Sequence, residues 1–287
     1  MNAVGQAVRG PAPSERVNRI ERRRGWFHLD IRELWAYREL LVFLIWRDVK
    51  VRYQQTFLGI AWAVLVPLTQ TLIATIIFFR LAHVPPEYKV PYPLFAFTGL
   101  LPWQYFSSTL AQSSTSVVGS SALVTKVYFP RLLMPLASVG VPVVDFLLGF
   151  LVLIGMFAWY GRAPHWHVVA IPVFLGMALL TAFGVGLWLS ALNVRYRDIP
   201  YVVPFMTQIW TFLTPVYYGV SFVPQRYHWL IALNPMTGVV DGFRWAVLGR
   251  GLPHYDVFLE SLAVGVALLL SGLWYFKRVE RHFADVI

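Results

Sequence analysis

Three carboxylates of this sequence lie in or beside long apolar stretches, where a charge is costly: Asp145, Asp241 and Glu260. An ionised carboxylate in hydrocarbon needs a partner or a polar cavity, so such residues are candidates for moving protons or ions. Arg244 stands three residues after Asp241, and at helical spacing these two side chains can neutralise each other. For Asp145 and Glu260 two interpretations stay open. One is proton coupling, and the other is an intersubunit hydrogen bond or a position near the lipid headgroups.

Other patterns that carry chemistry are weak or missing in the sequence. None of the four lysines belongs to a G-K-[ST] motif, so the chain does not bind ATP through a phosphate loop of that type. His165 and His167 are two residues apart, without an H-E-x-x-H motif or any cysteine, which disfavours a metal site. No paired carboxylates or Asp/His cluster occur at a predicted membrane face. The sequence therefore predicts a chain without its own cofactor or metal that is not an enzyme acting alone.

A short basic segment, SVVGSSALVTKVYFPR (116–131), separates two apolar stretches of membrane length. Between its two bases lie two aromatic residues that we expect to be exposed, Tyr128 and Phe129. A loop of this kind is a candidate docking surface for another protein. The candidate docking residues are Lys126, Val127, Tyr128, Phe129, Pro130 and Arg131.

The elements that position these residues belong to a membrane protein. The chain of 287 residues is 57% apolar and 13% charged, whereas soluble domains hold about 25% charged residues. Its net charge of +10 comes from bases beside apolar stretches, which is typical of membrane topology and not of nucleic-acid binding. We therefore predict an all-α integral membrane protein whose surroundings are membrane lipids.

The chain divides into four parts in this interpretation. Residues 1–30 contain six arginines and no apolar run, which predicts a disordered basic tail in the cytoplasm. Residues 31–56 place apolar side chains, among them Trp46, on one stripe, which predicts an amphipathic helix in the headgroup plane. A soluble helix packed on another domain is the alternative. Residues 57–276 form the predicted transmembrane domain, and residues 277–287 form a cytoplasmic C-terminal tail.

About six apolar stretches are long enough to cross roughly 30 Å of hydrocarbon. They lie at residues 57–79, 94–118, 132–160, 168–193, 201–220 and 257–276. With both termini on the cytoplasmic side, the cytoplasmic parts hold 18 of the 24 lysines and arginines, which supports this topology. The second stretch is rich in serine and threonine, which indicates either close helix packing or a polar path.

Residues 221–255 interrupt this pattern with two short apolar pieces, separated by Asn234 and Pro235. Pieces too short to cross predict re-entrant or interfacial helices before the last span. Asn234 is a candidate helix cap for the second piece, which contains Asp241 and Arg244.

Aromatic residues make up 16% of the sequence, and many of them fall at the predicted ends of spans. Trp and Tyr commonly anchor spans in the headgroup region. Their ring faces can also stack on sugar rings along a conduit, and both uses stay open. The candidates for stacking on a glycan are Trp62, Trp159, Tyr160, Tyr217 and Tyr218.

Four stretches of the sequence resemble a known family in the family's order. They are RYQQTFLGIAWAVLVP (52–67), LPWQYFSSTLAQSSTSVVGSSALVTKVYFPRLLMP (101–135), LNVRYRDI (192–199) and NPMTGVVDGFRWAVLG (234–249). They resemble the membrane subunits of ABC-2-type polysaccharide exporters, and the likeness is greatest to O-antigen and teichoic-acid translocation permeases. The resemblance covers nearly everything from about residue 30 onward, and several blocks in order are more specific than any single one.

This resemblance implies a homodimer of six-span subunits with a type V exporter-like fold in the bacterial inner membrane. Each subunit would pair with a separate cytoplasmic P-loop ATPase, which binds ATP and Mg. The segment 116–131 and the interfacial helix would contact that ATPase, and the re-entrant helices would cap the outer side of the channel. The cargo would be a glycan on an undecaprenyl diphosphate carrier, with O-antigen, capsule and teichoic acid left open.

The diphosphate of such a carrier would meet basic side chains at the cytoplasmic face. Arginine and lysine suit phosphate groups electrostatically. The candidates are Arg47, Lys50, Arg52, Arg195 and Arg197, and the alternative for each is a charge that only sets topology. Two rival functions stay open, namely an ion-coupled carrier and a multi-pass enzyme acting on lipid-linked sugars.

Overall fold

The computed structural model describes residues 31–54, 61–84, 87, 89–126, 128–249 and 254–283. Within these residues every regular element is a helix, which confirms the predicted all-α class. The predicted basic tail (1–30), Val127 and the last residues of the predicted C-terminal tail (284–287) lie outside the described residues.

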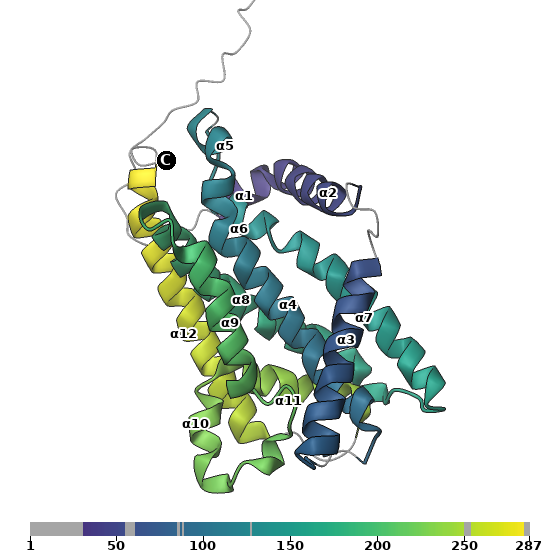
Figure 1. The fold of residues 1–287 in the computed structure, drawn as a ribbon. Helices are drawn as coiled ribbons and strands as arrows, with labels where there is room; N and C mark the ends of the chain where they lie inside the picture. Colours follow the sequence, from purple (N-terminus) through teal and green to yellow (C-terminus); the bar gives the residue numbers. More distant parts are fainter. Residues whose placement is uncertain are drawn as a thin grey trace, which may run out of the picture.

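Long helices run side by side along one axis of the molecule (Figure 1). They are α3 (Ala61–Ala74) with the π-helix η1 (Thr75–Leu81), α4 (Tyr92–Gly119), α7 (Gly140–Trp159), α8 (Ile171–Arg195), α9 (Ile199–Leu213) and α12 (Tyr255–Val279). Short helices join them: α5 (Ser121–Lys126), α6 (Leu133–Ala137), η2 (Trp166–Ala170), η3 (Val220–Phe222), η4 (Gln225–Tyr227), α10 (His228–Ala232), α11 (Pro235–Leu248) and η5 (Glu280–His282).

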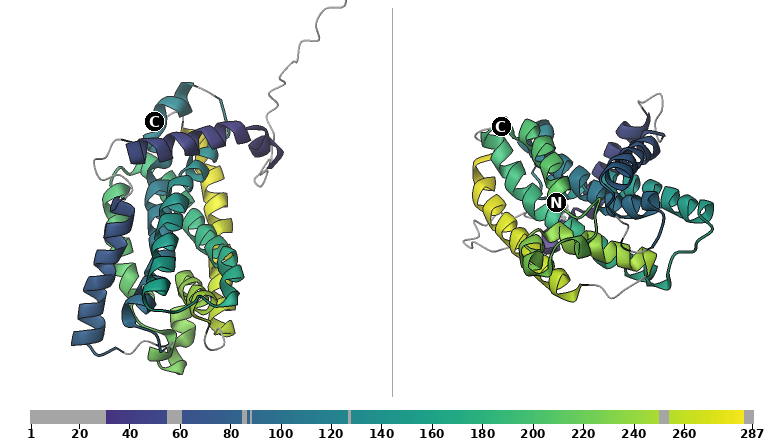
Figure 2. Two further views of the ribbon diagram at one scale, coloured as in Figure 1. Left: turned by 90° about the vertical axis from the view of Figure 1, so that its right-hand side faces the viewer. Right: turned by 60° about the horizontal axis from the view of Figure 1, so that its bottom comes forward.

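The two ends of this bundle carry different elements. At one end α2 (Arg38–Gln54), preceded by α1 (Ile31–Ala36), crosses the ends of the long helices, as Figure 2 shows. The helix α5 and the last turns of α12 lie at the same end, which we call the α2 end (Figure 1). At the opposite end, the α10 end, α10 and α11 fill the chain between α9 and α12 (Figure 1).

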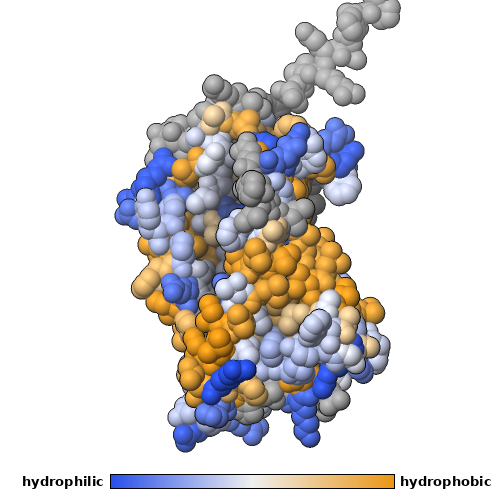
Figure 3. All heavy atoms as spheres, turned by 45° about the vertical axis from the view of Figure 1, so that its right-hand side comes forward, coloured by the Kyte–Doolittle hydropathy of each residue, from blue (hydrophilic) through white to orange (hydrophobic). Residues whose placement is uncertain are grey.

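Four helical stretches of the described residues are long and apolar enough to cross a membrane. They are Ala61–Leu81, Leu133–Trp159, Trp166–Arg195 and Tyr255–Val279. Figure 3 shows the corresponding apolar band between hydrophilic ends. The helix α4 has 28 residues without a charge but many hydroxyl and amide side chains, and α9 is a shorter apolar helix of 15 residues.

The fifth predicted span, 201–220, is wrong in its last part. The helix α9 ends at Leu213, and Thr214 has an extended backbone with φ −95° and ψ 140°. Pro215 follows Thr214, and the residue before a proline is disfavoured in the helical conformation. The remaining residues to Val220 form the connection toward α10 and α11.

The helix α4 lies at the centre of the fold and is buried along most of its length. Several of its hydroxyl groups support the packing interpretation of the serine-rich stretch. Thr109, Ser113 and Ser114 are buried, and a Cβ on Gly186 of α8 would collide with Ser113. The hydroxyls of Thr109 and Ser114 donate to carbonyls of their own helix, both at 2.7 Å. These residues therefore allow close packing of α4 on α8.

The helix α2 packs on α6 and α7 with one side only. Leu44 is buried, and Ile45 lies so close to Gly140 that a Cβ there would collide with it. Trp46, on the predicted stripe, is 57% exposed. Val42 and Phe43, one turn before it, are exposed as well. The interfacial amphipathic helix stays a prediction, because apolar side chains of α2 lie both against the protein and on its outward side.

Candidate functional site

A cavity of about 370 Å³ lies between α2, α3, α4 and α7. We call it the Arg52 cavity. It combines an ion pair, aromatic rings, hydroxyl groups and an amide in a largely apolar bundle. Its lining includes Arg52, Tyr53, Trp62, Gln104, Tyr105, Ser107, Ser108, Asp145 and Phe146.

Asp145 of α7 is held by two consecutive residues of α2. Its Oδ2 lies 2.9 Å from a terminal nitrogen of Arg52, and its Oδ1 accepts a hydrogen bond of 2.5 Å from the Tyr53 hydroxyl. Burial raises the pKa of Tyr53, and the bond to Asp145 raises it further, so that Tyr53 keeps its proton and donates. Asp145 is thus neutralised within the chain, and it ties α2 to α7.

A second cavity, also of about 370 Å³, opens between α3, α4 and α9. We call it the Thr207 groove. Its polar lining residues are Gln70, Gln104, Ser107, Thr207, Gln208 and Thr211, and Trp103, Phe212 and Tyr217 add aromatic surface.

The two cavities adjoin along α4. Gln104 and Ser107 line both of them, and Gln104 Nε2 donates a 2.7 Å hydrogen bond to Gln70 Oε1 of α3. Amides in an uncharged span are costly in lipid, so their clustering on one side of α4 marks this side as the candidate functional site. Sequence reasoning left a polar path open for the serine-rich stretch that includes Ser107, but it missed Gln70, Gln104 and the polar residues of α9. The signal was present as Gln104 and Ser107 three residues apart and as Thr207 and Thr211 four residues apart.

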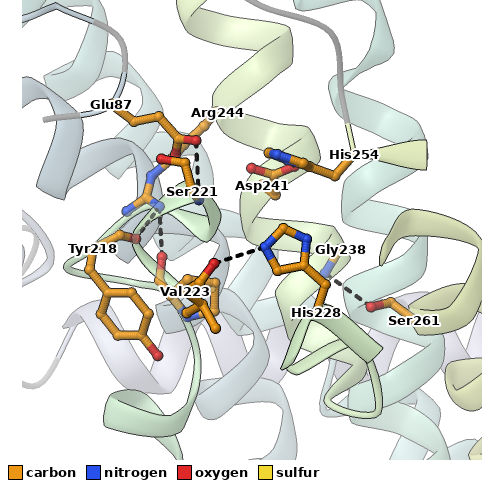
Figure 4. Close-up of polar contacts among 11 residues, drawn as sticks. Glu87, Tyr218, Ser221, Val223, His228, Gly238, Asp241, Arg244, His254 and Ser261 are labelled. Atoms are coloured by element: carbon orange, nitrogen blue, oxygen red, sulfur yellow. Dashed lines mark hydrogen bonds and ion pairs between the residues drawn. The ribbon is translucent and has the colours of Figure 1, made fainter. Parts of the chain in front are cut away.

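At the α10 end a fully buried arginine joins α11 to the chain after α9. Arg244 donates to the carbonyls of Pro215 at 2.6 Å, Tyr218 at 2.9 Å and Val216. Its guanidinium also lies 3.9 Å from the ring centroid of Phe95. These contacts fix the turn that carries Tyr217 and Tyr218 (Figure 4).

Asp241 pairs with His254 and not, as predicted, with Arg244. His254 Nδ1 donates to Asp241 Oδ2 over 3.0 Å, and Figure 4 shows the two side chains facing each other. This hydrogen bond raises the pKa of His254 against the opposing effect of burial. The prediction failed because Arg244 turns toward the carbonyls of the 215–218 turn.

The predicted cap Asn234 is confirmed. Its side chain accepts from the backbone of Met236 at 3.1 Å and from the indole of Trp210 at 2.9 Å, and Pro235 occupies the first helical position. Ser261 of α12 holds the same helix start by accepting from the Gly238 backbone at 3.1 Å (Figure 4).

The predicted docking residues have different surroundings. Lys126 ends α5, and Tyr128 is 76% exposed. Phe129 is only 5% exposed, because it packs in the apolar cluster at the α2 end, so its predicted exposure is wrong. Arg131 donates to the Glu280 carbonyl and lies over the ring of Phe283. Pro130, between them, is half-buried.

The predicted phosphate-attracting bases do not act as one group. Arg47 pairs with the neighbouring Asp48 at 2.8 Å, and Lys50 lies over the ring of Trp46. Arg195 and Arg197 are exposed where α8 ends. Arg52 lines the Arg52 cavity and is paired with Asp145.

The predicted stacking aromatics are likewise divided. Trp62 lines the Arg52 cavity, and Tyr217 lines the Thr207 groove and stacks on Phe78 at 5.2 Å. Trp159 is 86% exposed at the end of α7, where Tyr160 follows it. The Tyr218 hydroxyl donates to the Phe212 carbonyl at 3.2 Å.

Two further predictions concern Glu260 and a metal site. Glu260 is exposed in the second turn of α12. In the described part of the chain, no group of three or more His, Cys, Asp or Glu residues lies together as metal ligands would.

Comparisons with known proteins agree with the resemblance. A model of the family described as ABC-2 type transporter matches residues 39–248. The chain is 32% identical to the O-antigen export system permease protein RfbA of Myxococcus xanthus, over 90% of this chain and 98% of that protein. It is 30% identical to the O-antigen export system permease protein RfbA of Klebsiella pneumoniae, over 87% of this chain and 95% of that protein. It is 23% identical to the polysialic acid transport protein KpsM of Escherichia coli, over 78% of this chain and 90% of that protein. With its apolar helices and a family match over most of its length, the chain is a multi-pass membrane protein that belongs to the ABC-2 type transporter family.

Proposed function

We propose that this chain is the membrane-spanning subunit of an exporter for a lipid-linked polysaccharide, with O-antigen as the first cargo to test. The carrying observation is the polar patch on α4, where Gln104 and Ser107 line both the Arg52 cavity and the Thr207 groove. A hydrated glycan cannot cross hydrocarbon unaided, because unpaired polar groups lose their water there. A polar route through the bundle removes that cost. The names of the relatives support the cargo class.

We infer six spans from this arrangement, counting α4 and α9 with the four apolar stretches. Both helices run along the same axis as those stretches (Figure 1), although α9 is short for a span. The α2 end would face the cytoplasm of a bacterial inner membrane, as the charge count indicates. The helices α10 and α11 would then be re-entrant elements at the outer face.

A second copy of the chain would close the route. The Thr207 groove opens between α3 and α9, and both helices keep large apolar side chains exposed, among them Leu72 and Phe205. A polar groove that faced lipid would be costly, whereas a homodimer joined over α3 and α9 would enclose it.

Energy would come from a separate cytoplasmic ATPase, which would bind ATP and Mg. The absent G-K-[ST] motif and the family support this division. The docking surface at the α2 end would consist of Lys126, Tyr128 and Pro130. Arg131 would position the segment through Glu280 and would not itself touch the partner.

The test measures two quantities for each variant: the amount of glycan exported to the cell surface, and the amount of the host's ATPase subunit that co-purifies with the chain. We expect Tyr128→Ala to reduce recovery of the ATPase and export together. Tyr255→Ala is the matched control, because Tyr255 is also an exposed tyrosine, 60% exposed at the start of α12. It should change neither the recovery of the ATPase nor export. Export that continues at the normal level with an inactivated ATPase would refute the proposed function.

The ion-coupled alternative relies on Asp145 and Glu260 as isolated carboxylates. Asp145 is paired with Arg52 and hydrogen-bonded to Tyr53, whereas Glu260 is exposed on α12 and leaves this alternative open. For the enzyme alternative, the described residues include one acid–histidine pair, Asp241 with His254 at the α10 end, and no group of three such residues.

A further inference from the structure

We propose that the Arg52 cavity binds an uncharged sugar ring of the transported glycan, and that it does not bind the diphosphate of the carrier lipid. This inference rests on the proposed function and assigns a ligand class to one part of the route. Four observations carry it: the charge of the cavity, its aromatic wall, its unused hydrogen-bonding groups and its position.

The charge of the cavity is balanced. Arg52 is the only base among its described lining residues, and Asp145 lies 2.9 Å from it. The second oxygen of Asp145 is taken by the Tyr53 hydroxyl. A diphosphate that recruited Arg52 would leave Asp145, whose side chain is 20% exposed, without its counter-ion and beside new negative charge, which repels it. A neutral ligand leaves the pair intact.

The walls of the cavity suit a ring with one apolar face. Trp62 lines the cavity from α3 and is 54% exposed, so more than half of its surface is not covered by the chain. Tyr105 and Phe146 add a buried aromatic part to the lining, with ring centroids 5.9 Å apart. Aromatic faces pack on the C–H face of a sugar while their polar edges donate hydrogen bonds.

Several hydrogen-bonding groups that line the cavity do not use all of their donors and acceptors within the described chain. Within the described chain, the hydroxyls of Tyr105 and Ser108 form no hydrogen bond, and the Gln104 amide uses one donor, toward Gln70. Hydroxyl and amide groups both donate and accept, as sugar hydroxyls do. The volume of about 370 Å³ lies in the range of small-ligand pockets, about 300–1,000 Å³.

The position of the cavity fits a step before the groove. The cavity lies beside α2, and it shares Gln104 and Ser107 with the Thr207 groove. A sugar that leaves the cavity therefore meets polar side chains of the groove. The hydrogen bond between Gln104 and Gln70 lies at this junction and must open or shift to let the glycan pass.

The test compares two probes on the full-length chain in lipid nanodiscs. One is a short polyprenyl diphosphate that carries a single hexose, and the other is the same lipid diphosphate without sugar. We expect Trp62→Ala to weaken binding of the sugar-bearing probe about fivefold, from the loss of one stacking contact. Tyr105→Phe, which removes only a hydroxyl, should weaken it about threefold. Neither variant should change binding of the sugar-free probe.

Matched variants keep the comparison interpretable. Trp159→Ala removes a more exposed indole, 86% against 54% for Trp62, outside the cavity and should leave both probes unaffected. Trp62→Phe keeps a ring and should restore part of the loss. The inference is overturned if Trp62→Ala and Tyr105→Phe leave the sugar-bearing probe unchanged, if they weaken both probes equally, or if the wild-type chain binds neither. The proposed function fails separately, if export proceeds with an inactive ATPase.

Discussion

Replacement of Arg244 by methionine is expected to be among the most destabilising single changes in the chain. The side chain is fully buried and donates three hydrogen bonds to carbonyls of the 215–218 turn. Hydrogen bonds from a charged donor contribute about 1.5–3 kcal/mol each, but such contributions are not additive. Methionine leaves these buried acceptors unpaired and removes the contact with Phe95. We therefore expect Arg244→Met to lower the free energy of unfolding by about 3–5 kcal/mol.

The assay is reversible unfolding in mixed micelles, followed by circular dichroism. Arg226→Met is the matched control, because Arg226 lies at the same end of the molecule but is exposed over the ring of Tyr227. It should change the free energy of unfolding by no more than about 0.5 kcal/mol. Arg244→Lys should restore only part of the loss, since one ammonium group cannot match the geometry of the guanidinium fork. A loss below about 1 kcal/mol for Arg244→Met would refute the anchoring role.

Three further predictions concern an ion pair, a pH dependence and a helix contact. Asp145→Asn should lower the free energy of unfolding by about 1 kcal/mol or less and leave export intact; abolished export in a folded variant would favour ion coupling instead. The hydrogen bond to Asp241 raises the pKa of His254 above its ordinary value of about 6.5. The pair therefore contributes its full stabilisation of the fold below pH about 6.5, and this contribution is lost as the pH rises through the raised pKa. His254→Asn should flatten this dependence in thermal unfolding scans, and an unchanged pH profile would speak against the pair. Gly272→Ala should destabilise by about 1–3 kcal/mol, because the new Cβ would collide with a backbone carbonyl of α8. Its control Gly155→Ala meets no atom within 4 Å and should be neutral or stabilising by unfolding titration.

Hydropathy and local capping rules predicted the elements of this fold, because those signals depend on neighbouring residues. The helical stretches and the Asn234 cap followed from such patterns. The partner of Asp145 did not, since Tyr53 and Asp145 are 92 residues apart and only the packing of α2 on α7 brings them together. The same limit explains Asp241, whose partner His254 lies on the chain beyond α11.

The error at Phe129 has a different origin. A basic segment between two spans predicts exposure for all its residues, but a phenylalanine beside a bundle end gains free energy when it is buried. Phe129 packs with residues of α12 and of the chain after it, such as Phe276 and Phe283. Local composition therefore indicated where the segment lies but not which of its side chains face outward.

This packing connects the proposed docking segment, residues 128–131, to the opposite end of the molecule through α12. Arg131 is bound to the Glu280 carbonyl at the C-terminal end of α12. Near the other end of α12, Ser261 is hydrogen-bonded to the backbone of Gly238 in α11. Between them α12 packs against α8 at Gly272, without room for a single added methyl group, so the two helices resist bending apart. If the proposed docking segment is displaced, α12 and α8 are therefore expected to move together as one rigid pair and to carry the displacement to α11.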